Sequence, residues 1–110
     1  MALIPVSILI STTTSPAFQL GSNKIGAIRT PAALTGTAMT FLASDSETGT
    51  FLPVWSDAAA VSLVVAPSRH IAFGADEANA MAACNWVKLV SGSTELAQRD
   101  FVIVVENDPA

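Results

Sequence analysis

The chain is divided into short β-prone runs by clusters of turn-forming residues. Residues 6–10, 38–43 and 86–90 are rich in β-branched, aromatic and other apolar side chains. Clusters of Ser, Thr, Gly, Asn or Pro, which favour turns, lie between such runs. Short strands at this spacing are typical of antiparallel sandwiches and barrels, and not of alternating strands and helices. The sequence therefore predicts an all-β fold: a single antiparallel β-sandwich, jelly-roll-like, across residues 1–110.

Four local expectations refine this prediction. A period of two places Met39, Phe41 and Ala43 on one face of their strand. The same period places Ile25 and Ala27 on the face opposite Ile28. One short helix is expected near residues 76–84, where an acidic start precedes an alanine-rich stretch. Residues 1–14 are expected to form an N-terminal arm or an edge strand.

Composition and charge exclude several classes of protein. Hydrophobic residues make up 51% of the chain and charged residues 13%, which excludes an intrinsically disordered chain. The net charge of -4 argues against a nucleic-acid partner, since phosphate binding needs clustered Lys and Arg. Much of the apolar content is alanine, which buries little area per residue. This favours a protein that works in an assembly, with an ordinary monomer of alanine-rich surface as the alternative.

The N-terminal segment carries no sign of targeting. No cationic residue precedes the apolar residues 2–10, and no small-x-small cleavage site follows them, so a signal peptide is not expected. The run is also too short to span a membrane. We therefore expect synthesis in the cytoplasm and no membrane partner.

The sequence gives little support for a catalytic or a metal site. The chain has one histidine, His70, and one cysteine, Cys84, where a zinc site needs several such ligands. Ser68 lies close to His70 and Asp57 is a conceivable partner, but catalysis demands geometry that such proximity alone does not supply. Cys84 is expected to be a small buried apolar residue, and residues 45–49 a hairpin turn in preference to a calcium loop. No enzyme activity, cofactor or metal is predicted.

Binding surfaces are the remaining alternative to a catalytic or metal site. Trp55 and Trp86 could stack on a sugar ring if exposed, but a core position is favoured for both. The apolar strands at residues 2–10 and 101–105 could pair with another chain at an open edge, or lie inside their own sheet. The candidate interface residues are Ile4, Val6, Ile8, Ile10, Asp45, Glu47, Ser91, Ser93 and Thr94.

A wider pattern resembles a known class of proteins. Residues 31–45 and 49–55, followed by 69–73, 86–93 and 101–105, resemble small β-sandwich virion structural proteins of tailed bacteriophages. These are capsid decoration (cement) proteins or neck and tail accessory proteins, and the likeness extends over roughly residues 15–106. The resemblance implies a non-enzymatic homotrimer that binds the major capsid protein on the virion surface, after synthesis in the host cytoplasm. The alternative is a carbohydrate-binding or host-attachment module of the neck or tail.

Overall fold

The computed structural model describes residues 2–21, 24–56, 59–74 and 84–106, which are built of strands and loops. The helix expected near residues 76–84 lies almost wholly outside the described residues, and Cys84 itself is not helical. The strands are β1 (Ala2–Ile8), β2 (Phe18–Gln19), β3 (Lys24–Arg29), β4 (Ala38–Ser44), β5 (Leu52–Pro53), β6 (Trp55–Ser56), β7 (Ala59–Ala60), β8 (Ser62–Val64), β9 (His70–Ala72), β10 (Trp86–Ser91) and β11 (Arg99–Glu106).

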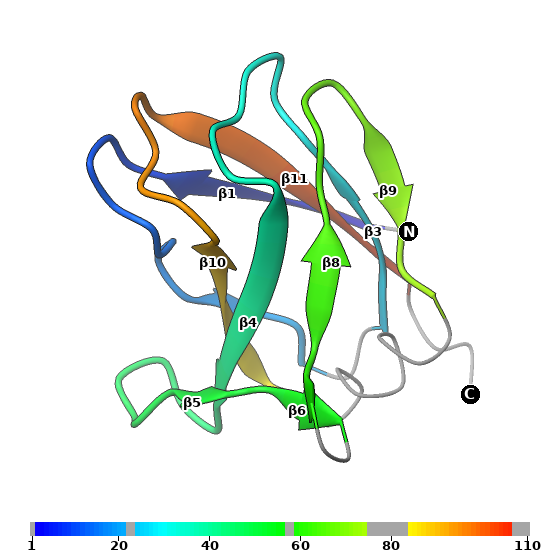
Figure 1. The fold of residues 1–110 in the computed structure, drawn as a ribbon. Helices are drawn as coiled ribbons and strands as arrows, with labels where there is room; N and C mark the ends of the chain where they lie inside the picture. The colour runs from blue at the N-terminus through cyan, green and yellow to red at the C-terminus, as the bar shows by residue number, and fades with distance from the viewer. Residues whose placement is uncertain (1, 22–23, 57–58, 75–83, 107–110) are drawn as a thin grey trace.

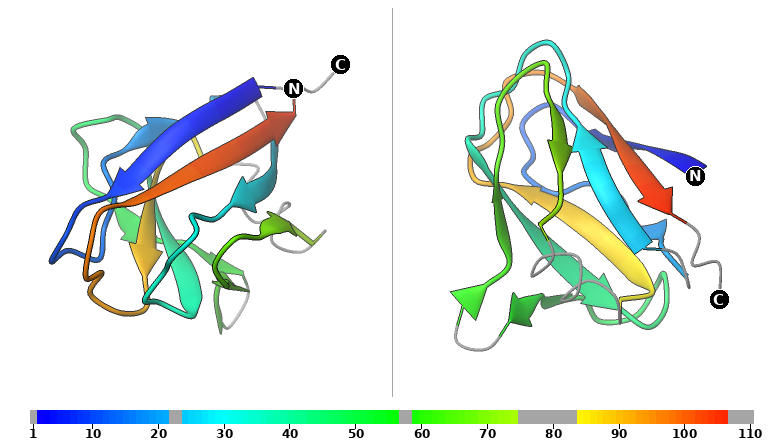
Figure 2. Two further views of the ribbon diagram at one scale, coloured as in Figure 1. Left: turned by 90° about the horizontal axis from the view of Figure 1, so that it is seen from above. Right: turned by 90° about the vertical axis from the view of Figure 1, so that its right-hand side faces the viewer.

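Two antiparallel sheets form the body of the molecule (Figures 1 and 2). The first has the order β1-β11-β3-β9; the second has the order β2-β10-β4-β5, with β8 also paired to β4. The pairs are nested, since β1 pairs with β11, β2 with β10, β3 with β9, and β4 with β5 and β8. The chain is thus one long hairpin rolled up between two sheets, which is the jelly-roll form of the β-sandwich. The predicted fold class is confirmed.

One hydrophobic core lies between the two sheets. Phe101 and Ile103 of β11 and Phe41 and Leu89 of the second sheet are buried in the same cluster. Met39 is fully buried beside Phe41, and Ala43 packs partly buried against the cluster. The predicted inward face of β4 is therefore confirmed. The alternate residues of β4 and β10 are half-buried on the opposite face, as the pleat of a strand requires.

Strand β3 departs from the predicted alternation. Ile25 and Ile28 both belong to the core cluster, whereas Ala27 is buried outside it. Val104 pairs with Ala27 but Val105 pairs with Ile25, so one residue of β3, Gly26, is extra in the ladder. A β-bulge of this kind resets the period of two. The prediction that Ile25 and Ile28 face opposite sides was therefore wrong.

The connections gather at two ends of the sandwich. The β4–β10 ladder runs from Ser44 opposite Trp86 to Met39 opposite Ser91, so the loops that follow Ser44 and Ser91 lie at opposite ends. Residues 9–13, 30–37, 65–68 and 92–98 lie along the upper side of Figure 1, and we call these four loops the loop end. β5 and β6 lie along the lower side.

Candidate functional site

The loop end is built around one buried carboxylate. Glu95 is completely buried and accepts four hydrogen bonds. The backbone N–H groups of Thr35 and Gly36 donate over 2.9 and 3.0 Å, and the Ser91 hydroxyl donates over 2.7 Å. Arg99 Nε donates over 2.9 Å and completes an ion pair with Glu95. A buried charge is tolerated because every side of it meets a donor.

These donors determine the ionisation of Glu95. Burial raises the pKa of this carboxyl group, but the hydrogen bonds from Ser91, Thr35, Arg99 and Gly36 outweigh burial and lower the pKa to about 2. Glu95 is therefore a carboxylate throughout the physiological pH range. Gly36 is required beside it, because a Cβ at this position would collide with Ser91 Oγ.

The backbone of Glu95 forms hydrogen bonds with a third loop, residues 9–13. Its carbonyl accepts a hydrogen bond from Ser11 N–H over 2.9 Å, and its own N–H donates to the Thr12 carbonyl over 3.1 Å. Ser11 has φ of 65°, a left-handed conformation that is uncommon outside glycine. Glu95 thus fixes loops 9–13, 30–37 and 92–98 to one another, and this bonding holds Ser11 in an unfavourable conformation.

Three large aliphatic side chains are exposed on these bonded loops. Leu9, Ile10 and Leu96 retain 52%, 60% and 74% of their accessible surface. The hydrogen bonds between Glu95 and the Ser11–Thr12 backbone bring the two loops that carry them side by side. We call Leu9, Ile10 and Leu96 the aliphatic patch. Exposed clusters of large apolar side chains mark interaction surfaces more often than single exposed residues do.

The four loops of the loop end carry almost no charge of their own. Within its four loops, all of which the structure describes, Glu95 is the only charged residue, and it is buried and paired with Arg99. The remaining surface consists of hydroxyl groups, the Gln98 amide and apolar side chains, including the exposed Ala32 and Ala33. The exposed Arg69, which follows loop 65–68, donates from Nη1 to the Pro67 carbonyl over 3.0 Å and is the cation beside these loops. The cores of protein–protein interfaces are similarly depleted of charged residues. The loop end is therefore the best candidate functional surface in the described structure.

The predicted interface residues of the first strand divide between core and surface. Val6 and Ile8 are buried in the core cluster, and Ile4 packs partly buried against it. The side chains of Val6 and Ile8 therefore cannot contact a partner in this fold. Ile10 follows the strand and is exposed in the aliphatic patch. β1 itself is an edge strand of the chain's own sheet.

The predicted polar interface residues do not form one surface. Ser93 and Thr94 are exposed at the loop end, whereas Asp45 and Glu47 are exposed in the hairpin loop at the other end of the β4–β10 ladder. Ser91 is buried, and it positions Glu95 rather than facing a partner. Leu9 and Leu96 were not among the predicted interface residues, although each is a large apolar residue two positions from a Ser or a Thr.

The two tryptophans lie in different surroundings. Trp55 is 59% exposed on β6, so the prediction of a core position was wrong for this residue. Its register partner is Ala60 of β7. Trp86 is half-buried on β10 and faces away from the core, since its neighbour Val87 is buried. Its register partners are Gln19 and Ser44, so polar side chains flank it on both sides.

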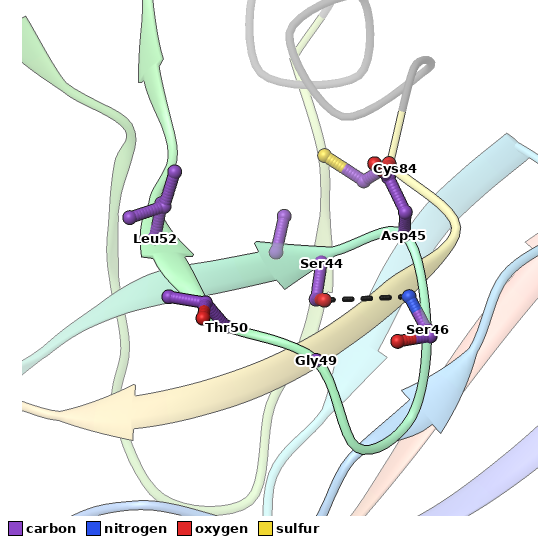
Figure 3. Close-up of a pocket in the computed structure, with 8 residues that line it drawn as sticks. Ser44, Asp45, Ser46, Gly49, Thr50, Leu52 and Cys84 are labelled. Atoms are coloured by element: carbon purple, nitrogen blue, oxygen red, sulfur yellow. Dashed lines mark hydrogen bonds between the residues drawn. The ribbon is translucent and has the colours of Figure 1, made fainter.

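A pocket of about 410 Å³ lies beside the predicted hairpin turn (Figure 3). Ser44, Asp45 and Ser46 border it on one side, and Leu52 and Cys84 border it on others. Ser44 Oγ accepts a hydrogen bond from Ser46 N–H, and β4 pairs with β5, as expected for a hairpin. Burial raises the pKa of the Cys84 thiol, which disfavours a reactive thiolate.

The remaining catalytic candidates are not assembled into a site. His70 Nδ1 accepts a hydrogen bond from Arg29 Nε over 3.2 Å, and Asp57 lies outside the described residues. The residues that the structure describes contain no group of three His, Cys, Asp or Glu side chains placed to hold a metal ion. The same residues include no helix of the length and hydropathy needed to cross a membrane. Comparison with known proteins found no match to a family model, to a curated protein or to a solved structure.

Proposed function

We propose that this chain is a non-enzymatic structural protein of a tailed-phage virion, a capsid decoration (cement) protein that docks on the shell through its loop end. The observation that carries the proposal is the aliphatic patch, held on loops of low charge by the buried Glu95 network. Jelly rolls are common among viral capsid and lectin domains, although a fold alone does not determine function. The proposed partner is the major capsid protein, and the proposed assembly is a homotrimer on the capsid surface.

The proposed mechanism is mechanical cohesion. Burying a large aliphatic side chain contributes about 1.5–3 kcal/mol when it is fully exposed beforehand. Leu9, Ile10 and Leu96 begin roughly half to three-quarters exposed, so together they supply a few kcal/mol per copy. Because the Glu95 network already orders the loops, little conformational entropy is lost on docking. Many copies that bridge capsid subunits would then add cohesion against internal pressure.

A charge placed in the aliphatic patch tests this proposal. Ile10→Asp and Leu96→Asp are each expected to abolish co-sedimentation of the protein with undecorated phage shells, because a carboxylate would have to be desolvated at the contact. Leu52→Asp is the matched control, since Leu52 is 64% exposed at the other end of the sandwich. Circular dichroism checks that all three variants fold. Shell binding that survives both patch changes contradicts the proposal.

Glycan binding is a second candidate function, favoured by the setting of Trp86. Its register partners on the two neighbouring strands are Gln19 and Ser44, and Asn85 Oδ1 accepts a hydrogen bond from Gln19 Nε2 over 3.4 Å. Sugar sites combine an aromatic surface with polar groups that bind hydroxyls. The register partner of Trp55 is an alanine, so the more exposed tryptophan has the less suitable neighbour.

Under this second candidate, a glycan array binds the wild-type protein and Trp86→Ala loses that signal. Trp55→Ala serves as the control and is expected to keep it, since no polar pair flanks this residue in the β6–β7 ladder. Equal loss in both variants would argue against Trp86 as the specific stacking residue. Absence of any array signal from the wild-type protein removes the candidate.

A further inference from the structure

The four-stranded sheet has two edges that are complementary in direction. Its order is β1-β11-β3-β9 and every pair is antiparallel, so β1 and β9 run in opposite directions. Among the described residues, each of these strands has a strand partner on one side only. A rotation about an axis parallel to the strands places β9 of one copy antiparallel to β1 of the next. Contacts of this head-to-tail kind close into a ring when the rotation between copies is an exact fraction of a full turn.

The backbone groups on both edges are oriented for pairing. Thr30 N–H donates to the Arg69 carbonyl, and Phe73 N–H donates to the Gly26 carbonyl. Because antiparallel bonding alternates along a strand, the N–H and carbonyl groups of His70 and Ala72 face away from β3. The same alternation continues through the registers of β3, β11 and β1. It leaves the backbone groups of Ser7, and of every second residue before it in β1, facing away from β11.

Pro5 is one of these outward-facing neighbours. A proline lacks the N–H donor, and edge strands tolerate it where no ladder bond is lost. With Ser7 opposite His70 and Pro5 opposite Ala72, three backbone hydrogen bonds remain available between copies. Pro5 therefore limits the edge to a short pairing and disfavours extended edge aggregation.

The two edges also carry opposite charge on the outer face of the sheet. Arg29 and His70 are exposed register partners at the β9 edge, linked by the hydrogen bond from Arg29 Nε. Asp100 is exposed near the β1 edge, where its Oδ1 accepts hydrogen bonds from Ser7 Oγ over 2.7 Å and Gln98 Nε2 over 2.9 Å. Ser7 opposite His70 would place Asp100, Ser7, His70 and Arg29 in one row across the contact.

We propose that three copies of this chain join edge to edge, with β9 of each copy paired to β1 of the next and Asp100 facing the Arg29–His70 pair. The number of copies rests on the proposed function, whereas the choice of edges rests on strand direction and charge. The exposed loop end stays free in such a ring, because it lies beyond the ends of the strands. The occupant of each edge is thus a second copy of this chain.

Exchange of the two charges tests this proposal. Light scattering after size exclusion is expected to give three times the mass of the 11.3 kDa chain for the wild type. Arg29→Glu and Asp100→Arg should each reduce the mass to that of the monomer, because like charges then meet at the contact. The double variant should recover the trimer. Asp45→Arg, which makes the same charge change as Asp100→Arg at an exposed site distant from both edges, should leave the trimer intact.

The outcomes separate this proposal from the proposed function. A wild-type protein that stays monomeric at high concentration overturns the edge pairing, as does a double variant that remains monomeric while folded. Co-sedimentation with shells is measured on the same samples. Trimers that do not bind shells would support the edge pairing and contradict the decoration role. Monomers that bind shells would contradict the edge pairing and support the decoration role.

Discussion

Glu95→Ala is expected to lower the free energy of unfolding by about 3–5 kcal/mol, the range found when one partner of a buried ion pair is removed. The substitution deprives the Thr35 and Gly36 N–H groups of their acceptor and leaves the largely buried Arg99 without its carboxylate. Both losses act in the folded state, because water satisfies the same groups after unfolding. Urea titration at neutral pH, followed by circular dichroism, measures the change.

Glu47→Ala provides the comparison for this result. Glu47 is an exposed acid in the hairpin loop at the other end of the sandwich, so its loss is expected to change stability by less than about 0.5 kcal/mol. Equal stability of the two alanine variants would show that the buried network contributes nothing beyond an ordinary surface charge. A large loss confined to Glu95→Ala supports the role assigned to this residue.

Glu95→Ala also links the stability of the fold to docking. Glu95 joins the loop that carries Leu9 and Ile10 to the loop that carries Leu96, through its backbone bonds to Ser11 and Thr12. The Glu95 side chain fixes this pair of loops onto loop 30–37 and Arg99. Removal of the Glu95 side chain therefore loosens the support of the aliphatic patch without changing any residue of the patch. In the proposed function, a preorganised patch is what makes docking favourable.

The strands of the sandwich could be predicted from the sequence because their signals are local. Residues 38–43 and 86–90 show the period of two within a single strand, and that period is imposed by a buried inner face. The antiparallel sandwich follows from many short strands with turns between them, and the structure confirms it. The order of the strands does not follow from their spacing, because several jelly-roll and Greek-key topologies share it. The bulge at β3 could not be predicted in this way, because its position depends on the pairing with a strand about 80 residues later.

The candidate site depends on contacts that are distant in sequence. Glu95 meets Thr35 and Gly36 across about 60 residues, so no local spacing identifies it as a buried acid. Trp55 was wrongly expected in the core because an aromatic residue in a strand usually faces inward. In the structure Val54 takes the buried position, and Trp55 lies on β6, which pairs only with β7 among the described strands. Single-strand periodicity does not contain this information.

Acid is expected to remove the contribution of Glu95 over a defined pH window. The pKa of Glu95 is about 2 in the folded protein, below its ordinary value of 4.5, so the folded state binds this proton more weakly than the unfolded state. The resulting stabilisation is fully present above pH 4.5 and is lost as the pH falls toward 2. This gap in pKa corresponds to about 3 kcal/mol.

Glu95→Gln isolates this effect, because glutamine keeps the size of the side chain and does not titrate. The difference in unfolding free energy between the wild type and Glu95→Gln is expected to shrink by about 3 kcal/mol between pH 4.5 and pH 2. Asp100→Asn is a necessary second control, since hydrogen bonds from Gln98 and Ser7 also lower the pKa of the exposed Asp100. Urea titrations of the three proteins at a series of pH values measure the profiles. Parallel profiles for the wild type and Glu95→Gln would mean that the four hydrogen bonds do not stabilise the ionised form of Glu95 in the folded state.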